Sequence, residues 1–178
     1  MIRRIRILLA ACLFAAPAFA QTDTDRLKAD LLAARSATQV LGQWCAARHL
    51  ADPPVIHAVR DPVMVAPSAE VRALLHVSAD RAVRYRRVRL TCGNHVLSEA
   101  DNWYVPARLT PAMNAALDTS DTPFGKAVKA LNFHRRTLDA RPHPLPGTVL
   151  TIRAVLLTPG ETPFSLVVEN YTNDLVSH

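Results

Sequence analysis

The residues most able to bind a ligand are an arginine and a glutamate on two predicted strands that lie far apart in the chain. Arg87 belongs to the alternating stretch 85–92. Above small neighbours, a guanidinium can hold a carboxylate through two parallel charge-assisted hydrogen bonds, although a solvated strand face also fits the pattern. Glu169 falls near the end of an otherwise apolar strand, either as a solvated strand end or as an acid in a partly dry site. The pattern alone leaves both choices open.

A second pair of acids, Glu99 and Asp101, stands two residues apart on the strand that follows Arg87. Because strand side chains alternate between faces, the two carboxylates share one face, which we predict to be the face of Arg86 and Val88. They are interpreted either as cross-strand ion-pair partners of Arg86 or as a catalytic carboxylate pair.

The element that positions these residues is a predicted β-hairpin over residues 85–106. Its first arm is 85–92, and its second begins at 95 or 96 and ends at 105. The turn is centred on Gly93-Asn94 or on Asn94-His95, both of which tolerate positive φ. Arg87 is then expected opposite Ala100 or Asn102, on the same side of the sheet in either register.

Around this hairpin the pattern predicts helices and further strands. Helix formers without proline fill 23–49, Ser68 caps a helix that ends near 77, and Thr110-Pro111 begins a helix over 112–117. A short helix is expected over 126–131. Strands are expected over 55–59, 132–138, 148–158 and 163–171. We therefore predict one α+β domain over 21–178, with a single antiparallel sheet of five or six strands and helices packed on one side.

The first twenty residues have the pattern of a secretory signal peptide. Three arginines precede an apolar run over 7–16, which is too short to span a membrane, and Ala18-Phe19-Ala20 is a small-x-small cleavage signal before Gln21. A lipoprotein signal ending at Cys12 is the alternative. We expect a bacterial periplasmic or secreted protein without stable membrane insertion after cleavage.

The charge and the motifs of the chain argue against several classes of partner and site. Cleavage would remove three arginines and no acid, so the net charge would fall from +6 to +3. Basic clusters lack aromatic interleaving and zinc-finger spacing, so no nucleic-acid partner is predicted. Histidines are scattered, so no metal site is predicted. Nucleophile-elbow and glycine-rich phosphate motifs are missing from the sequence. The sequence identifies no protein partner.

Two cysteines remain after the predicted cleavage, Cys45 and Cys92. An even number of cysteines in an exported chain favours a disulfide, and two buried free thiols are the alternative.

The order and spacing of several of these pieces resemble the chorismate pyruvate-lyase family over about residues 71–174. The pieces are Arg87 with Cys92 five residues later, Pro106 at the end of the second arm, Thr122-Pro123-Phe124-Gly125, and the terminal strand ending near Glu169. The family's fold is shared with ligand-sensing domains of bacterial transcription regulators. The resemblance implies a chorismate lyase-like fold.

For the site, the resemblance implies that Arg87 holds a substrate carboxylate and that Glu169 is the acid at the ring-hydroxyl or ether end. Phe124 would supply a backbone contact and a wall, and Asn102 stands at a substrate-binding position where the family favours a basic residue. Arg87 and Glu169 would converge on one cavity. Such enzymes release pyruvate from chorismate to give 4-hydroxybenzoate, and they need no cofactor. Two functions are expected: an exported lyase of this kind, or a non-catalytic periplasmic module that binds an aromatic or cyclic carboxylate.

Overall fold

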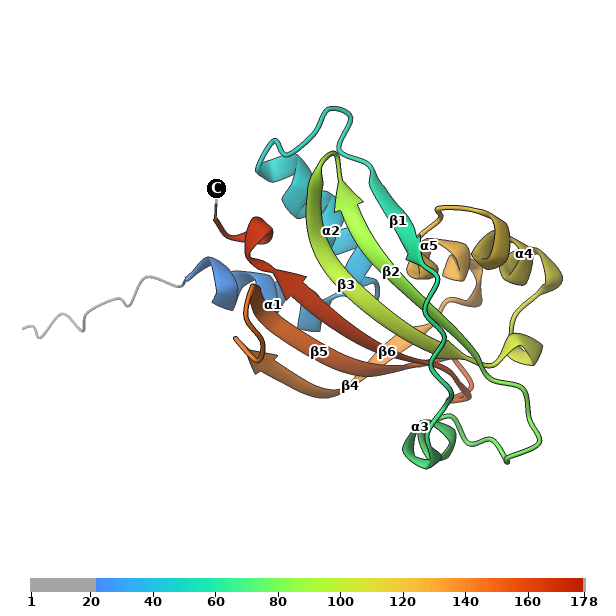
Figure 1. Ribbon diagram of the computed structural model, residues 1–178. Helices are drawn as coiled ribbons and strands as arrows, with labels where there is room; N and C mark the ends of the chain where they lie inside the picture. The colour runs from blue at the N-terminus through green and yellow to red at the C-terminus, as the bar shows by residue number, and fades with distance from the viewer. Residues whose placement is uncertain (1–21, 178) are drawn as a thin grey trace, which may run out of the picture.

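Six strands form one antiparallel sheet with helices against one face (Figure 1). The computed structural model describes residues 22–177. The strand order is β1-β2-β3-β6-β5-β4. The strands are β1 (Ile56–Asp61), β2 (Arg84–Cys92), β3 (His95–Tyr104), β4 (His134–Pro142), β5 (Thr148–Leu157) and β6 (Pro163–Thr172). This architecture confirms the predicted α+β class.

Two of the helices begin directly after a residue that is predicted to cap them. They are α1 (Asp23–Ala33), α2 (Ala37–Ala47), α3 (Ala69–Leu74), α4 (Pro111–Thr119) and α5 (Phe124–Ala127), with short 3₁₀ turns at 106–108, 129–131 and 173–175. The Ser68 and Thr110 hydroxyls each accept a hydrogen bond from a backbone N–H three residues on, both at 3.2 Å. These bonds satisfy N–H groups that have no partner within the helix.

The main core lies between the sheet and helices α1, α2, α4 and α5. In Figure 1, α1 and α2 lie behind the sheet. We call this side the covered face. Leu27 and Leu41 from the helices pack there with Ala100 and Ile152 from the strands, all 5% exposed or less. The other side, the outer face, is partly covered by α3, whose Val71 packs among apolar residues of the strands.

The β2–β3 hairpin has a register that differs by one residue from the prediction. Gly93 and Asn94 form the turn, as predicted, and Cys92 pairs with His95. A β-bulge then shifts the register between Leu90 and Thr91, because the first pairs with Ser98 and the second with Val96. One extra residue in β3 moves every later residue of that strand to the opposite face relative to β2.

The bulge corrects two expectations. Arg87 lies opposite Asp101 instead of Ala100 or Asn102, so its neighbours are acids and not small residues. Glu99 and Asp101 share the face of Arg87, and not that of Arg86 as predicted.

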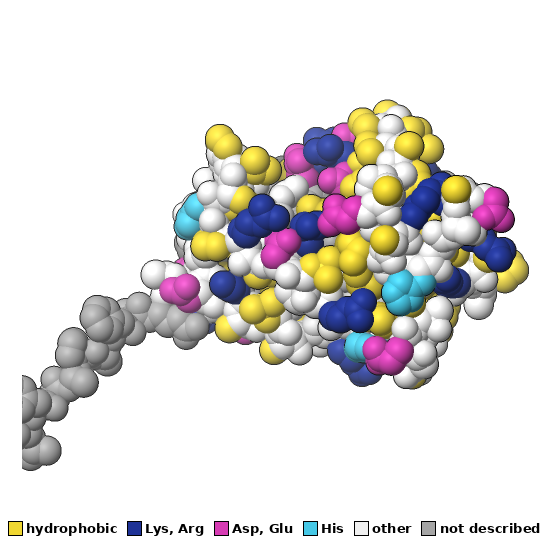
Figure 2. Space-filling model, turned by 90° about the horizontal axis from the view of Figure 1, so that it is seen from below, with side chains coloured by type: hydrophobic (Ala, Val, Ile, Leu, Met, Phe, Trp, Pro, Cys, Tyr) yellow, Lys and Arg dark blue, Asp and Glu magenta, His cyan; other side chains and the backbone are white. Residues whose placement is uncertain are grey.

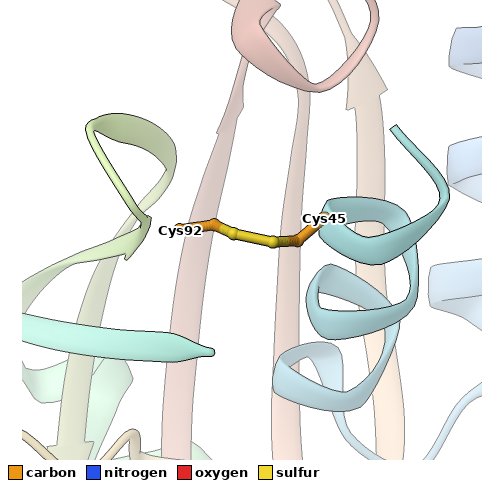
Figure 3. Close-up of a disulfide and its surroundings, with 2 residues drawn as sticks. All are labelled: Cys45 and Cys92. Carbon is orange, nitrogen blue, oxygen red and sulfur yellow. A yellow bond between two sulfur atoms is a disulfide. The ribbon is translucent and has the colours of Figure 1, made fainter. Parts of the chain in front are cut away.

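A disulfide joins Cys45 of α2 to Cys92 at the end of β2 (Figure 3). The two Cα atoms lie 6.3 Å apart, and both residues are fully buried. The bridge therefore confirms the predicted pairing. It attaches α2 to the sheet at the end of the hairpin.

We expect the double variant Cys45→Ala/Cys92→Ala to have a free energy of unfolding about 2–4 kcal/mol lower than the wild type. The bridge closes a loop with a sequence separation of 47 residues, and losing it frees the unfolded chain. Urea denaturation checks this, and the reduced wild type is the control that should behave alike. A difference below about 0.5 kcal/mol would show that the bridge contributes little.

The signal-peptide prediction concerns residues 1–20, which lie outside the described residues. Within the described part, none of the helices combines the length and apolarity needed to cross a membrane.

Candidate functional site

A small cavity lies between the covered face and the helices α2 and α5. Its volume is about 30 Å³, enough for one water-sized molecule. The sheet register builds its floor, because Val88, Ala100 and Glu169 pair in a row across β2, β3 and β6. Residues along the remaining wall are Ser36, Ala37, Thr38, Leu90, Asn102, Phe124, Gly125, Phe133, Arg135, Leu156 and Val167. We call this space the inner cavity.

The structure brings three of the four predicted ligand-binding residues to the inner cavity: Asn102, Phe124 and Glu169. Each comes from a different element, β3, α5 and β6. All three are buried, with exposed fractions of 3%, 6% and 7%. Their roles toward a ligand stay a prediction, but they share one site.

Arg87 is not part of this site. It pairs with Asp101, which pairs with Val168, whereas Glu169 pairs with Ala100, so Arg87 and Glu169 lie on opposite faces. On the outer face, Arg87 Nη2 donates to Glu99 at 3.2 Å and lies within ion-pair distance of two further acids. The prediction that Arg87 and Glu169 converge on one cavity is wrong, because the residues alternate along their strands and the register sets their faces.

Glu169 is held by a buried network. Arg135 of β4 donates to both of its carboxylate oxygens, at 3.3 and 2.6 Å, and the Tyr171 hydroxyl donates at 2.9 Å. The side chains of Arg135 and Glu169 are 6% and 9% exposed. Burial alone would lower the pKa of Arg135, but the charge of Glu169 and the hydrogen bonds raise it overall. Burial also raises the pKa of Tyr171, so its proton stays on the hydroxyl.

This geometry limits what Glu169 can do. Both carboxylate oxygens already accept hydrogen bonds, from Arg135 and Tyr171. A ligand group would have to displace one of these donors to reach Glu169.

Arg86 is a further cation, which was not among the predicted ligand-binding residues. It lies on the covered face opposite Asn102 and is 3% exposed. One nitrogen donates to the Thr122 carbonyl at 3.2 Å, while Nε and Nη1 have no hydrogen-bond partner. Burial lowers the pKa of Arg86 to about 10. Among the described residues, no carboxylate lies within ion-pair distance of it, which is rare for a buried arginine.

A signal for Arg86 was present in the sequence. Arg86 alternates with Val88, Leu90 and Cys92, so its strand face is apolar, while Arg87 shares its face with Arg89 and Thr91. An arginine on the apolar face of a strand is the better candidate for a buried ligand contact.

A wider, basic depression opens beside the inner cavity. Its volume is about 390 Å³, and it shares Ser36, Thr38, Gly125 and Phe133 with the cavity wall. Its rim carries Arg35, Lys126 and Lys129. We call it the mouth, because it shares part of its wall with the inner cavity.

A larger groove of about 760 Å³ runs between α1 and α2, away from the covered face of the sheet. Trp44 in its wall donates to Asp30 at 2.8 Å. Both nearby arginines, Arg26 and Arg48, pair with Asp23 and lie 5.9 and 5.1 Å from the Trp44 ring centroid. Because these polar groups already have partners, we place the functional site at the inner cavity.

The described residues contain no group of three or more histidine, cysteine and acidic side chains that could hold a metal ion.

Comparison with known proteins identifies a family. No family model matches the chain. The uncharacterized protein y4mC of Sinorhizobium fredii is 43% identical over 175 residues, which cover 84% of this chain and 73% of y4mC. The chain belongs to the y4mC family.

Solved structures include proteins that are similar to this chain. The effector domain of PhnF from Mycobacterium smegmatis matches with a TM-score of 0.56 at 11% identity, over 78% of this chain and 89% of that domain. The possible transcriptional regulator YydK from Bacillus subtilis matches with a TM-score of 0.48 at 12% identity, over 68% of this chain and 60% of YydK. This chain thus spans less than two thirds of that regulator. At such identities the likeness concerns the fold, the chorismate lyase-like fold that the resemblance implies.

Proposed function

We propose that this protein is a binding module for a small anionic ring compound, which occupies the inner cavity. The observation that carries the proposal is the buried, unpaired guanidinium of Arg86 next to the Asn102 wall of that cavity. A buried cation without a counter-charge is costly, and a ligand carboxylate would supply the missing charge and hydrogen bonds. Arg86 then takes the role that the resemblance gave to Arg87.

The walls of the cavity suit a ring. Phe124 and Phe133 stand on one side and Val88 and Ala100 on the floor, with the Asn102 amide as the polar group that can orient the ligand. Sites of this kind are mostly apolar with a few placed polar groups. A ring exceeds the present volume, so binding requires α5, a helix of four residues, to move away from α2.

Binding without catalysis is favoured over the lyase activity that the resemblance implies. Arg135 and Tyr171 already occupy both carboxylate oxygens of Glu169, so that a departing enolpyruvyl group has no free contact with this acid. The match to a domain described as the effector domain of PhnF also supports a binding role. Export to the periplasm, with cleavage before Gln21, is part of this proposal, and the disulfide supports it because oxidising compartments favour such bridges.

Two-dimensional amide NMR tests the site with chorismate and 4-hydroxybenzoate as probes. We expect both to shift the resonances of Ala100, Asn102 and Gly125 at the cavity, and to leave Ala47 in the α1–α2 groove unchanged. We expect chorismate to persist without release of 4-hydroxybenzoate. Shifts confined to the groove would contradict the proposed site, and enzyme-dependent product formation would establish the lyase instead.

A further inference from the structure

The mouth contains three cations that have no acid partner. In the part of the chain that the structure describes, no carboxylate lies within ion-pair distance of Arg35, Lys126 or Lys129. Some other arginines of the described chain do pair with acids, as in Arg84 with Asp118 and Arg153 with Glu70. Figure 2 shows this mixing on the side seen from below, where basic and acidic side chains are interspersed. What distinguishes the mouth is that three such cations line one depression.

Asp121, the acid whose charge interacts with Lys126, already contacts His57. His57 chiefly, and Lys126 in small part, lower the pKa of Asp121, whose carboxylate lies 2.5 Å from the His57 ring nitrogen. Asp121 therefore does not neutralise the mouth. Cations gathered around one depression repel each other and attract an anion from solution.

The mouth also offers neutral donors. The hydroxyls of Ser36 and Thr38 and the amide of Asn132 line the same depression as the three cations. Ser36 makes no side-chain capping bond to α2, so its hydroxyl is available to a ligand. A carboxylate has two oxygens, whereas a phosphate monoester has three terminal acceptor oxygens and about −1.5 to −2 charges. The number of donors and of positive charges suits the phosphate better.

We propose that the mouth binds a phosphate-type group, so that the ligand is a ring compound with a carboxylate at its inner end and a phosphate or phosphonate at its outer end. This rests on the proposed function, because the ring and carboxylate occupy the inner cavity. Continuity between the two spaces through Ser36, Thr38, Gly125 and Phe133 allows one molecule to reach both.

Isothermal titration calorimetry with five probes separates the two ends of the site. The probes are inorganic phosphate, phenyl phosphate, 4-hydroxybenzoate, 4-carboxyphenyl phosphate and terephthalate. We expect 4-carboxyphenyl phosphate to bind roughly 100-fold more tightly than either single-ended ring, since one molecule then gains both anion contacts. Terephthalate, with a second carboxylate in place of the phosphate, should bind more weakly than 4-carboxyphenyl phosphate.

Charge reversal at the rim provides the matched test. The double variant Lys126→Glu/Lys129→Glu should lower the affinity for 4-carboxyphenyl phosphate by roughly 100-fold, because like charges would then face the phosphate. Its affinity for 4-hydroxybenzoate should stay within about threefold of the wild-type value. Both lysines are exposed, so folding should persist. The control, Arg81→Glu/Arg136→Glu, changes the net charge equally at exposed positions outside the mouth and should have little effect.

The possible results distinguish failure of the phosphate site from failure of the proposed function. Equal affinity for 4-hydroxybenzoate and 4-carboxyphenyl phosphate, or equal loss in the control, would overturn the phosphate site while leaving the proposed function intact. Tight phenyl phosphate binding that the lysine reversal abolishes, with no gain from the carboxylate, would support the mouth and contradict the inner carboxylate site. Binding to phosphatidylglycerol vesicles without binding of any soluble phosphate would assign the mouth to a lipid headgroup and overturn the small-molecule ligand.

Discussion

Replacing Arg86 by Met is expected to abolish ligand binding while making the ligand-free protein more stable. The free energy of binding 4-hydroxybenzoate should become less favourable by about 2–5 kcal/mol, as when one partner of a desolvated charge pair is removed. The free energy of unfolding should rise by about 1–2 kcal/mol, because an unpaired buried charge is replaced by an apolar chain of similar length. The lost hydrogen bond to the Thr122 carbonyl offsets only part of that gain.

Arg87→Met is the matched control on the adjacent residue. Arg87 is about one third exposed and pairs with acids on the outer face. Exposed ion pairs contribute little, so stability should change by less than about 1 kcal/mol and ligand affinity should stay the same. Calorimetric titration measures the ligand affinity of Arg86→Met and Arg87→Met, and urea denaturation measures their free energy of unfolding. The opposite pattern, with affinity lost only in Arg87→Met, would restore the site that the family resemblance implies.

Replacing Arg135 by Met should lower the free energy of unfolding by about 3–5 kcal/mol, because it leaves the Glu169 carboxylate buried without its counter-charge. The double variant Arg135→Met/Glu169→Met should recover most of this loss, since apolar pairs of similar volume replace buried ion pairs at little cost. A double-mutant cycle by urea denaturation measures the coupling.

Arg141→Met is the control for that cycle. It lies on the same strand, and its pair with Asp139 is exposed, with 63% and 27% of the two side chains accessible. Its loss should cost less than about 1 kcal/mol. If Arg135→Met cost no more than Arg141→Met, the buried network would not be what holds Glu169 in place.

The sequence predicted the elements of this fold because local signals are strong. Proline after the Thr110 cap, the Gly93-Asn94 turn and the alternation of the last two strands each specify a local structure, and the structure confirms them. The position of the bulge in β3 carried no comparable signal, since a bulge depends on how the whole sheet twists and packs. That one residue decided which arginine of β2 lies opposite Asn102.

Part of the candidate functional site could be predicted from the sequence. Asn102, Phe124 and Glu169 were identified from the order of motifs, and the structure brings them together. Arg135 is 34 residues from Glu169 and lies two strands away, so no local pattern indicated that the two would pair. Likewise, the basic mouth assembles from α2, α5 and the turn after it, whose contacts exist only in the folded chain.

The most direct test of the account is a crystal structure of the protein with 4-hydroxybenzoate. We expect electron density for the ring between Asn102 and Phe124, with α5 displaced from α2 and the carboxylate within hydrogen-bond distance of Arg86. Density on the outer face beside Arg87, or in the groove beside Trp44 with the inner cavity closed, would contradict it.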